Sequence, residues 1–488
     1  MIAQKGVRFS NAFSTINSTD PSFTTIFTGK HPLSHGLRHH AKMVTATEKS
    51  YTTNLKFLPE ILKEHDFTTI GIDWLGKWHR RGYDYYAGVK NSLTDSVQPD
   101  SEAEKNKNAS LDQKERVKIA YSNLKPKRFK DLIFPSRGSW YYYLPSELRR
   151  YIRTVALSAN TKSGKSLSGR KKRPFLTDSA GLSDLAIRYI REFAGKQNFF
   201  LFVHYWDNHI PYTAPRSYVR DFLKNHDYPK TKISTILKEL GGTKAEYLIN
   251  RTVRGKLPKT AGEIMAHYDA SIKYVDSNIN RIYKTIEETG ILDDTLILIT
   301  ADHGESHIEH DIYFDHHGLY DPQLKIPLIM HHPELPTGSV YDEFVQHFDI
   351  VPTILELTRI KDTGVKLDGM SLMNLTKGRG WDRDFVVAEE MSAHEKRMIR
   401  DKNYKYIKAL NQEKCYLCMK YHSRGDEFYD LQADPDEKVN IIDNPKHKQY
   451  KIRLEEYISA LEKPKEGRQV KFEDEEEVNK RLEALGYI

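Results

Sequence analysis

The chain has few cysteines and no long apolar run, and both absences narrow the kinds of protein it can be. Its 488 residues include only Cys415 and Cys418, which excludes a scaffold held together by several disulfides. No stretch approaches the ~20 consecutive apolar residues that a membrane-spanning helix needs. No signal peptide is visible, so the compartment stays open, and the sequence as it stands reads as cytoplasmic.

The length is large for a single hydrophobic core and predicts roughly two to four structural units. Apolar residues make up 39% of the chain, which is enough for a sizeable core. The net charge of +8 can favour anionic substrates, but over so long a chain it does not indicate nucleic acid, which we do not expect as a partner. The oligomeric state cannot be inferred.

Strands that alternate with helices predict an α/β fold, with a mostly parallel sheet flanked by helices. Apolar runs favour strands at 68–72, 198–203 and 295–300. Helical spacing is clearest at 266–287, and it also indicates helices at 54–64 and from Ser183, which could cap its helix, to Phe193.

The composition changes twice along the chain and predicts its domains. Residues from about 100 to 180 are polar and rich in lysine and arginine, which indicates a solvated insertion with some local helix. After residue 378, short strand-like pieces precede a charged helix near 446–462. We therefore expect a catalytic α/β domain over 1–378 and a smaller α+β subdomain, an antiparallel sheet plus a helix, over 379–488.

The run Ala301-Asp-His-Gly-Glu305 directly follows the predicted strand at 295–300. Asp302 and His303 therefore lie just past the C-terminal end of a buried strand, where ligands and metals gather in open α/β sheets. A carboxylate beside an imidazole suits a divalent metal, although a solvated polar loop can also carry such a pair. A second group of ionisable residues follows and ends in His316 and His317.

Three other segments place groups that suit an anionic oxygen after a predicted strand or turn. Thr19 precedes a Pro-Ser step, and a helix starting there would turn free N–H groups toward an anion; a plain capping turn is the alternative. Lys77 and His79 can both face an anion, or can be an exposed lysine beside a packed histidine. His209 can donate to an oxyanion, or can be a core histidine satisfied by a backbone carbonyl.

Taken together, these segments resemble the signatures of the sulfatase family, within the alkaline phosphatase superfamily. The resemblance runs nearly from end to end, and it is carried by Phe9-Ser-Asn-Ala-Phe-Ser14, Thr19-Asp-Pro-Ser22, Gly76-Lys-Trp-His79, Phe200-Leu-Phe-Val-His-Tyr-Trp-Asp-Asn-His-Ile-Pro-Tyr212, Ala301-Asp-His-Gly-Glu305, His317-Gly-Leu-Tyr-Asp321, Asp349-Ile-Val-Pro-Thr-Ile-Leu355, Asp368-Gly-Met-Ser-Leu372 and Phe428-Tyr-Asp-Leu-Gln-Ala-Asp-Pro-Asp-Glu437. It implies an alkaline-phosphatase-like fold that hydrolyses a sulfate or phosphate ester of a small molecule or glycan.

The resemblance also implies a role for each candidate residue. Thr19 occupies the position of the nucleophile, and Asp302, His303 and Thr19 would bind a divalent metal. Calcium is the expected ion, with zinc, manganese or magnesium as alternatives. The sulfate or phosphate oxygens would be held by Lys77, His79 and His209, and the leaving group would lie near His316 and His317.

Two departures from the family pattern bear on the reaction. Sulfatases oxidise their nucleophile to formylglycine, an aldehyde, and Thr19 cannot give an aldehyde because its Cβ carries a methyl group. Phe23 also stands where the family has arginine. The opening strand and the paired aspartates that complete the family's metal site are missing, and we expect them before Met1. Without those carboxylates a metal would bind weakly.

Three hypotheses follow. The first is a metal-dependent hydrolase of sulfate esters, the second a phosphoester or phosphonate hydrolase with a threonine nucleophile, and the third an inactive homologue that binds an anion or a partner. Separately, Cys415 and Cys418 with His422 could form part of a zinc site, but one cysteine pair supplies only two of four ligands. A hairpin tip with two reduced thiols is the alternative.

Overall fold

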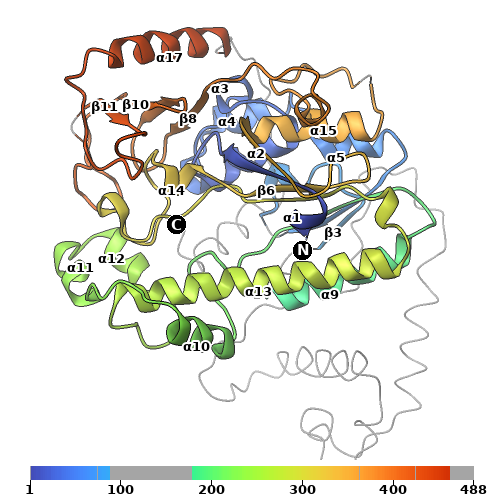
Figure 1. Cartoon of the computed structure of the whole chain (residues 1–488), viewed down its shortest axis with the longest axis horizontal. Coiled ribbons are helices and arrows are strands. Elements are labelled where there is room, and N and C mark those ends of the chain that lie inside the picture. Colours follow the sequence, from blue (N-terminus) through green and yellow to red (C-terminus); the bar gives the residue numbers. More distant parts are fainter. Residues whose placement is uncertain (1, 74, 88–177, 362, 424, 462–488) are drawn as a thin grey trace, which may run out of the picture. The chain divides into compact units, whose positions relative to one another are not determined.

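The computed structural model describes residues 2–73, 75–87, 178–361, 363–423 and 425–461 (Figure 1). Nearly all of the predicted basic insertion at about 100–180 lies outside these residues. Within the described part, none of the helices is both long enough and apolar enough to cross a bilayer.

Two sheets form the α/β part and confirm the predicted class. A four-stranded sheet has the order β5-β6-β1-β7, with strands Ile297–Thr300, Leu328–His331, Val7–Phe13 and Ser339–Gln346. A three-stranded parallel sheet has the order β3-β2-β4, with strands Tyr85–Ala87, Thr68–Ile72 and Phe199–Val203. The first sheet is mixed, because β1 runs parallel to β7 but antiparallel to β6, and β5 also pairs antiparallel with β6.

Helices cover these sheets because each has an apolar face to bury. The long helix α13 (Ala261–Glu288) runs along α9 (Ser179–Phe193), and α2, α5 and α15 lie over another part of the sheets (Figure 1). Aromatic rings fix α2 against β4, since the rings of Phe27 and Phe202 are 4.9 Å apart in an edge-to-face contact. The described helices of the α/β part are α1 (Ile2–Lys5), α2 (Thr19–Thr28), α3 (Pro32–His35), α4 (Ala46–Thr52), α5 (Leu58–Lys63), α9, α10 (Arg216–Asn225), α11 (Ile233–Glu239), α12 (Lys244–Ile249), α13, α14 (Asp321–Leu324), α15 (Ile350–Leu357) and α16 (Leu372–Thr376), with 3-10 turns η1 (Ala41–Met43), η2 (Lys77–Arg80), η7 (Leu292–Asp294), η8 (Glu309–Asp311) and η9 (His347–Asp349).

One predicted helix start is wrong. Ser183 is buried inside α9, where it hydrogen-bonds to the hydroxyl of Tyr205 at 2.8 Å. The helix is capped five residues earlier by Asp178, whose carboxylate accepts from the backbone N–H of Ala180. The apolar face extends back to Leu182, so the serine did not mark its end.

The C-terminal part is the predicted antiparallel sheet with a helix. Its strands have the order β11-β10-β9-β8, with bounds Glu427–Asp430, Tyr404–Ala409, Lys396–Arg400 and Val386–Glu390. Helix α17 (His447–Leu461) buries Leu454 and Ile458 against it. Buried Lys405 of β10 pairs with Asp321 of α14 at 2.7 Å, which ties this sheet to the α/β part. The boundary at residues 378 and 379 stays a prediction.

Candidate active site

Thr19 is the first residue of α2, as the Pro-Ser step predicted. The preceding Ser18 is extended, with φ −142° and ψ 146°, and its side chain does not cap the helix. Thr19 is 1% exposed, and its Oγ1 lies 3.5 Å from Nε2 of His303. The hydroxyl of Thr19 also helps to lower the pKa of the Asp302 carboxyl. The structure thus brings together the three residues that were predicted to form the metal and nucleophile site.

The loop that carries Asp302 is fixed by hydroxyl groups. Ser14 and Ser22 both donate to the backbone carbonyl of Asp302, at 2.9 and 2.6 Å. Burial on its own would raise the pKa of the Asp302 carboxyl, but the neighbouring His303 and His204 outweigh it and lower this pKa to about 2. Asp302 therefore carries a full negative charge at neutral pH, directly beside Thr19.

His209 and His316 lie near this group and share one hydrogen-bonding arrangement. The Nδ1 of His316 donates to the carbonyl of Asn17 at 2.6 Å, and the Nδ1 of His209 donates to the carbonyl of Ile210 at 2.6 Å. A proton on Nδ1 leaves the lone pair on Nε2. Burial lowers the pKa of His209 to about 3 and that of His316 to about 4, so both rings are neutral at pH 7. The ring of His316 lies 4.1 Å from that of His303, centroid to centroid.

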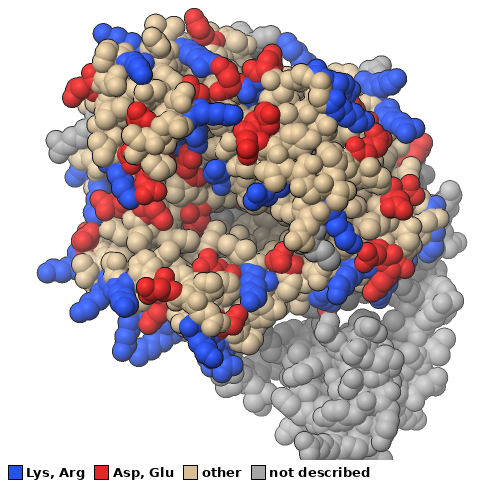
Figure 2. Space-filling view, viewed as in Figure 1, with Lys and Arg blue, Asp and Glu red and all other residues tan. Residues whose placement is uncertain are grey.

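A cleft of about 410 Å³ adjoins these residues. Asn17, Ser18, His209 and His316 are among the residues that line it. Basic and acidic side chains are interspersed over the face of the molecule shown in Figure 2, so a bound anion would depend on local groups more than on a broad basic surface.

Lys77 and His79 converge on Asp20, the residue after Thr19. The Nζ of Lys77 lies 3.0 Å from Oδ2 of Asp20, and Nε2 of His79 donates to the backbone carbonyl of Asp20 at 3.2 Å. His40 approaches the same carboxylate at 3.0 Å. The contacts with Asp20 place Lys77 and His79 at the N-terminal end of α2. Whether either residue also contacts the substrate oxygens stays a prediction.

His317 faces a different set of residues from His316. Its Nδ1 lies 3.4 Å from Oδ1 of Asp315, and its ring lies 5.1 Å from that of His422 and 6.1 Å from that of His394. His317 thus lies near residues of the C-terminal part. That His316 and His317 both lie near the leaving group stays a prediction.

The donors around Asp302 do not complete a site for a divalent ion. Calcium takes six to eight oxygen ligands, whereas Asp302, Thr19 and His303 offer one carboxylate, one hydroxyl and one imidazole. Among the described residues, the only group of three or more histidine, cysteine or acidic side chains with converging ligand atoms lies elsewhere. We therefore assign no chemical step to a metal at this position.

Sequence reasoning missed Asp73 and His204, which pair at 2.8 Å between Nδ1 and Oδ1. Asp73 directly follows β2 and His204 directly follows β4, so they occupy the same edge of the parallel sheet as the predicted residues. That position after a strand was the signal that could have found them.

The fold is that of the alkaline phosphatase superfamily. The family model described as Sulfatase matches residues 1–360, and a second model, N-sulphoglucosamine sulphohydrolase, C-terminal, matches residues 309–464. Since the first match covers well over half of the sequence, the chain belongs to the sulfatase family.

Individual relatives agree with this assignment. An arylsulfatase of Clostridium perfringens is 28% identical over 297 residues, which cover 59% of this chain and 58% of the relative. The human N-acetylglucosamine-6-sulfatase is 26% identical over 263 residues, which cover 52% of this chain and 45% of the relative. The chain thus matches about half the length of these curated relatives. A phosphonate monoester hydrolase from Silicibacter pomeroyi has a similar fold, with a TM-score of 0.60, 19% identity and coverage of 94% of this chain and 88% of its own.

Proposed function

We propose that this chain hydrolyses sulfate esters, with Thr19 as the nucleophile. The observation that carries the proposal is the position of the Thr19 hydroxyl at the start of α2, 3.5 Å from Nε2 of His303. The Nδ1 of His303 donates to the carbonyl of Gly304 at 2.8 Å, which leaves the lone pair on Nε2. That lone pair can accept the proton of Thr19 as its oxygen attacks sulfur.

The remaining groups would act on the ester itself. The sulfate oxygens would meet the backbone N–H groups at the start of α2 and the side chains of His209 and His316, which line the cleft. A bound anion raises the pKa of a nearby imidazole, so these rings would become protonated only when the ester is present. As the ester S–O bond breaks, His316 could then give its proton to the leaving oxygen, and water would later release sulfate from Thr19.

A phosphoester or phosphonate is the second candidate, and the methyl group of Thr19 favours it. Threonine cannot form the aldehyde that sulfatases use, whereas a threonine oxygen can attack phosphorus and form a phosphothreonine that water then cleaves. Asp302 stays ionised and Thr19 stays buried in either case, so the site geometry does not separate the two substrates.

Members of this superfamily generally depend on a divalent metal. We propose the same for this chain, with calcium as the ion, Asp302 and Thr19 as part of its ligand set, and further donors that these residues do not supply. Because its relatives include an N-acetylglucosamine-6-sulfatase, we propose a sulfated sugar or another small ester as the substrate.

The test is hydrolysis of an aryl sulfate and the matching aryl phosphate by the full chain, with calcium, magnesium, manganese or zinc added in turn. We expect sulfate release, abolished in Thr19→Ala and retained in part in Thr19→Ser, which keeps the hydroxyl. Faster phosphate release, with trapped phosphothreonine, would replace the first candidate by the second. No turnover with any ion would favour the inactive homologue that binds an anion or a partner.

A further inference from the structure

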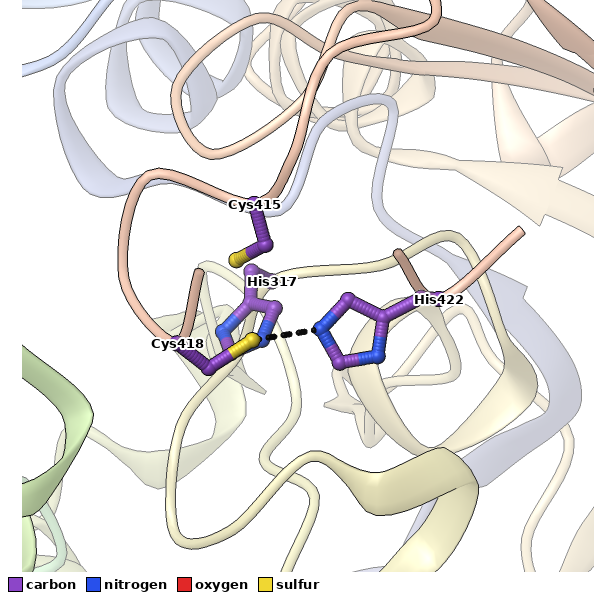
Figure 3. A group of neighbouring side chains, drawn as sticks. All are labelled: His317, Cys415, Cys418 and His422. Atoms are coloured by element: carbon purple, nitrogen blue, oxygen red, sulfur yellow. Dashed lines mark hydrogen bonds between the residues drawn. The ribbon is translucent and has the colours of Figure 1, made fainter. Parts of the chain in front are cut away.

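We propose that His317, Cys415, Cys418 and His422 form a closed, tetrahedral zinc site. This site is separate from the proposed active site and does not depend on it. The ligand atoms of the four side chains all lie within 4.8 Å of one another, and Figure 3 shows them turned toward a common centre. Both cysteines are free and buried.

The spacing of these atoms suits zinc. With Zn–S bonds of about 2.3 Å and Zn–N bonds of about 2.0 Å, the ligand atoms of a tetrahedral site lie about 3.3–3.8 Å apart. Sγ of Cys418 and Nε2 of His422 are 3.0 Å apart without an ion, so small shifts would admit one. Two thiolates and two imidazoles are a common zinc ligand set, and the soft sulfur atoms disfavour calcium and magnesium.

The backbone around the cysteines forms a compact turn that holds both sulfur atoms on one side. The N–H of Met419 donates to the carbonyl of Cys415 at 2.8 Å, and the N–H of Cys415 donates to the carbonyl of Lys420 at 2.9 Å. Met419 adopts a left-handed conformation with φ 57°. His422 lies four residues after Cys418, so one short loop supplies three of the four ligands, and His317 comes from the α/β part (Figure 3).

In each histidine, the Nδ1 atom lies near an oxygen that could accept its proton. Nδ1 of His422 lies 3.2 Å from the carbonyl of His310, and Nδ1 of His317 lies 3.4 Å from the carboxylate of Asp315. Metal-bound histidines typically donate their second N–H to a carbonyl or a carboxylate in this way. Both rings would therefore present Nε2 to the ion.

A purely apolar core does not explain this cluster. His317 is 4% exposed, and within the described part of the chain neither of its ring nitrogens makes a hydrogen bond of normal geometry. Such an arrangement costs free energy unless another partner is present. The loop also exposes its large side chains, Tyr416 at 58% and Met419 at 56%, while it buries its two cysteines. Because free cysteines are often buried as small apolar groups, the ring nitrogens of His317, more than the two thiols, indicate an ion.

An ion here would join the C-terminal part to the cleft. Tyr416 and Leu417, next to Cys415 and Cys418, line the cleft together with His317. The carbonyl of Leu417 accepts from the N–H of Ala245 at 2.9 Å, so the loop also contacts α12. With four protein ligands the site has no open position, which indicates a structural ion that fixes this wall of the cleft.

The test is the metal content of the full chain after dialysis into metal-free buffer, together with titration by Co²⁺. We expect one zinc per chain and, with Co²⁺, the intense thiolate-to-metal absorption of a tetrahedral thiolate site. Cys418→Ser should lose the zinc and this absorption. Asp315→Asn, which removes the negative charge beside the ring of His317, should weaken zinc binding roughly 10–100-fold.

Two controls separate this site from other binding. Asp302→Asn alters the proposed active site and should keep the zinc, and so should His394→Asn, a buried neighbour whose ring lies 5.2 Å from that of His422. The proposal fails if the wild-type chain binds no stoichiometric zinc, if zinc persists unchanged in Cys418→Ser, or if native protein carries a Cys415–Cys418 disulfide. If a variant does not fold, the Co²⁺ spectrum of the wild-type chain still tests the proposal, because the absence of thiolate-to-metal absorption would contradict it.

Discussion

Replacing Lys77 with methionine should destabilise the fold, because Lys77 neutralises a buried charge. Asp20 is fully buried and the Lys77 side chain is 6% exposed, with 3.0 Å between their charged atoms. Burial on its own would raise the pKa of Asp20, but Lys77 and then His40 hold it well below its usual range. Lys77→Met would leave that carboxylate with two close partners, His40 at 3.0 Å and the backbone N–H of Ala41 at 2.8 Å, and with the ring of His79 farther away at 3.9 Å.

Breaking a buried ion pair by removing one partner costs about 3–5 kcal/mol. Because Asp20 keeps two partners, we expect the lower end, about 3 kcal/mol of the free energy of unfolding at pH 7. The stabilisation from an acid with a depressed pKa is present above its unfolded pKa and is lost as pH falls. The deficit of Lys77→Met should therefore be full at pH 7 and narrow toward pH 4, where Asp20 in the variant takes up a proton.

Urea unfolding of the full chain, followed by circular dichroism at both pH values, measures this deficit. Lys56→Met is the matched control, since Lys56 pairs with the exposed Glu64 and should change stability by less than about 1 kcal/mol. The double variant Lys77→Met/Asp20→Asn should recover much of the loss. If Lys77→Met is as stable as the control while KM for an ester rises, then Lys77 binds substrate and the reasoning is wrong.

Three further predictions rest on other parts of the structure. Burial lowers the pKa of His31 to about 4, so the free energy of unfolding should fall as pH drops from about 6.5 to 4. His31→Asn keeps a capping acceptor for α3 and should reduce this fall, measured as the difference between urea midpoints at pH 7 and 5. Arg383 holds buried Asp349 with two N–H groups, so Arg383→Lys should lower the unfolding free energy by about 1–3 kcal/mol in urea titrations, and an unchanged midpoint would contradict that role. Removing zinc with a strong chelator should lower the free energy of unfolding of the wild-type chain, measured in urea, by up to about 4 kcal/mol if zinc had been present at about 1,000 times its Kd. Cys418→Ser should show no such change.

The sequence predicted the elements whose pattern is long or strongly apolar. The helix expected at 266–287 is α13, and the strands expected at 68–72 and 295–300 are β2 and β5. It did not predict that β5 and β6 run antiparallel within a mixed sheet, because strand direction depends on pairing between residues about thirty positions apart. The start of α9 was misplaced because a buried serine resembles a cap when burial is unknown.

The candidate site was predicted in part. Thr19, Asp302 and His303 meet as expected, because the position after a strand places side chains at one edge of the sheet. Lys77 and His79 contact Asp20, the residue after Thr19, since a buried carboxylate attracts the nearest cation, and their predicted contact with the substrate stays a prediction. No periodicity in the sequence could show that contact, because it joins a loop after β2 to the first turn of α2.

The adjacent histidines His316 and His317 connect the proposed active site with the proposed zinc site. Both lie outside the helices and strands, and their rings have different neighbours. The ring of His316 lies beside that of His303, while His317 lies beside Cys418 and His422, and both histidines line the cleft. Because His316 and His317 are consecutive, an ion bound by His317 would also fix the backbone that orients the ring of His316. Loss of the ion should then change KM or kcat for an ester as well as the free energy of unfolding. The distant substitution Lys56→Met should leave both KM and kcat unchanged.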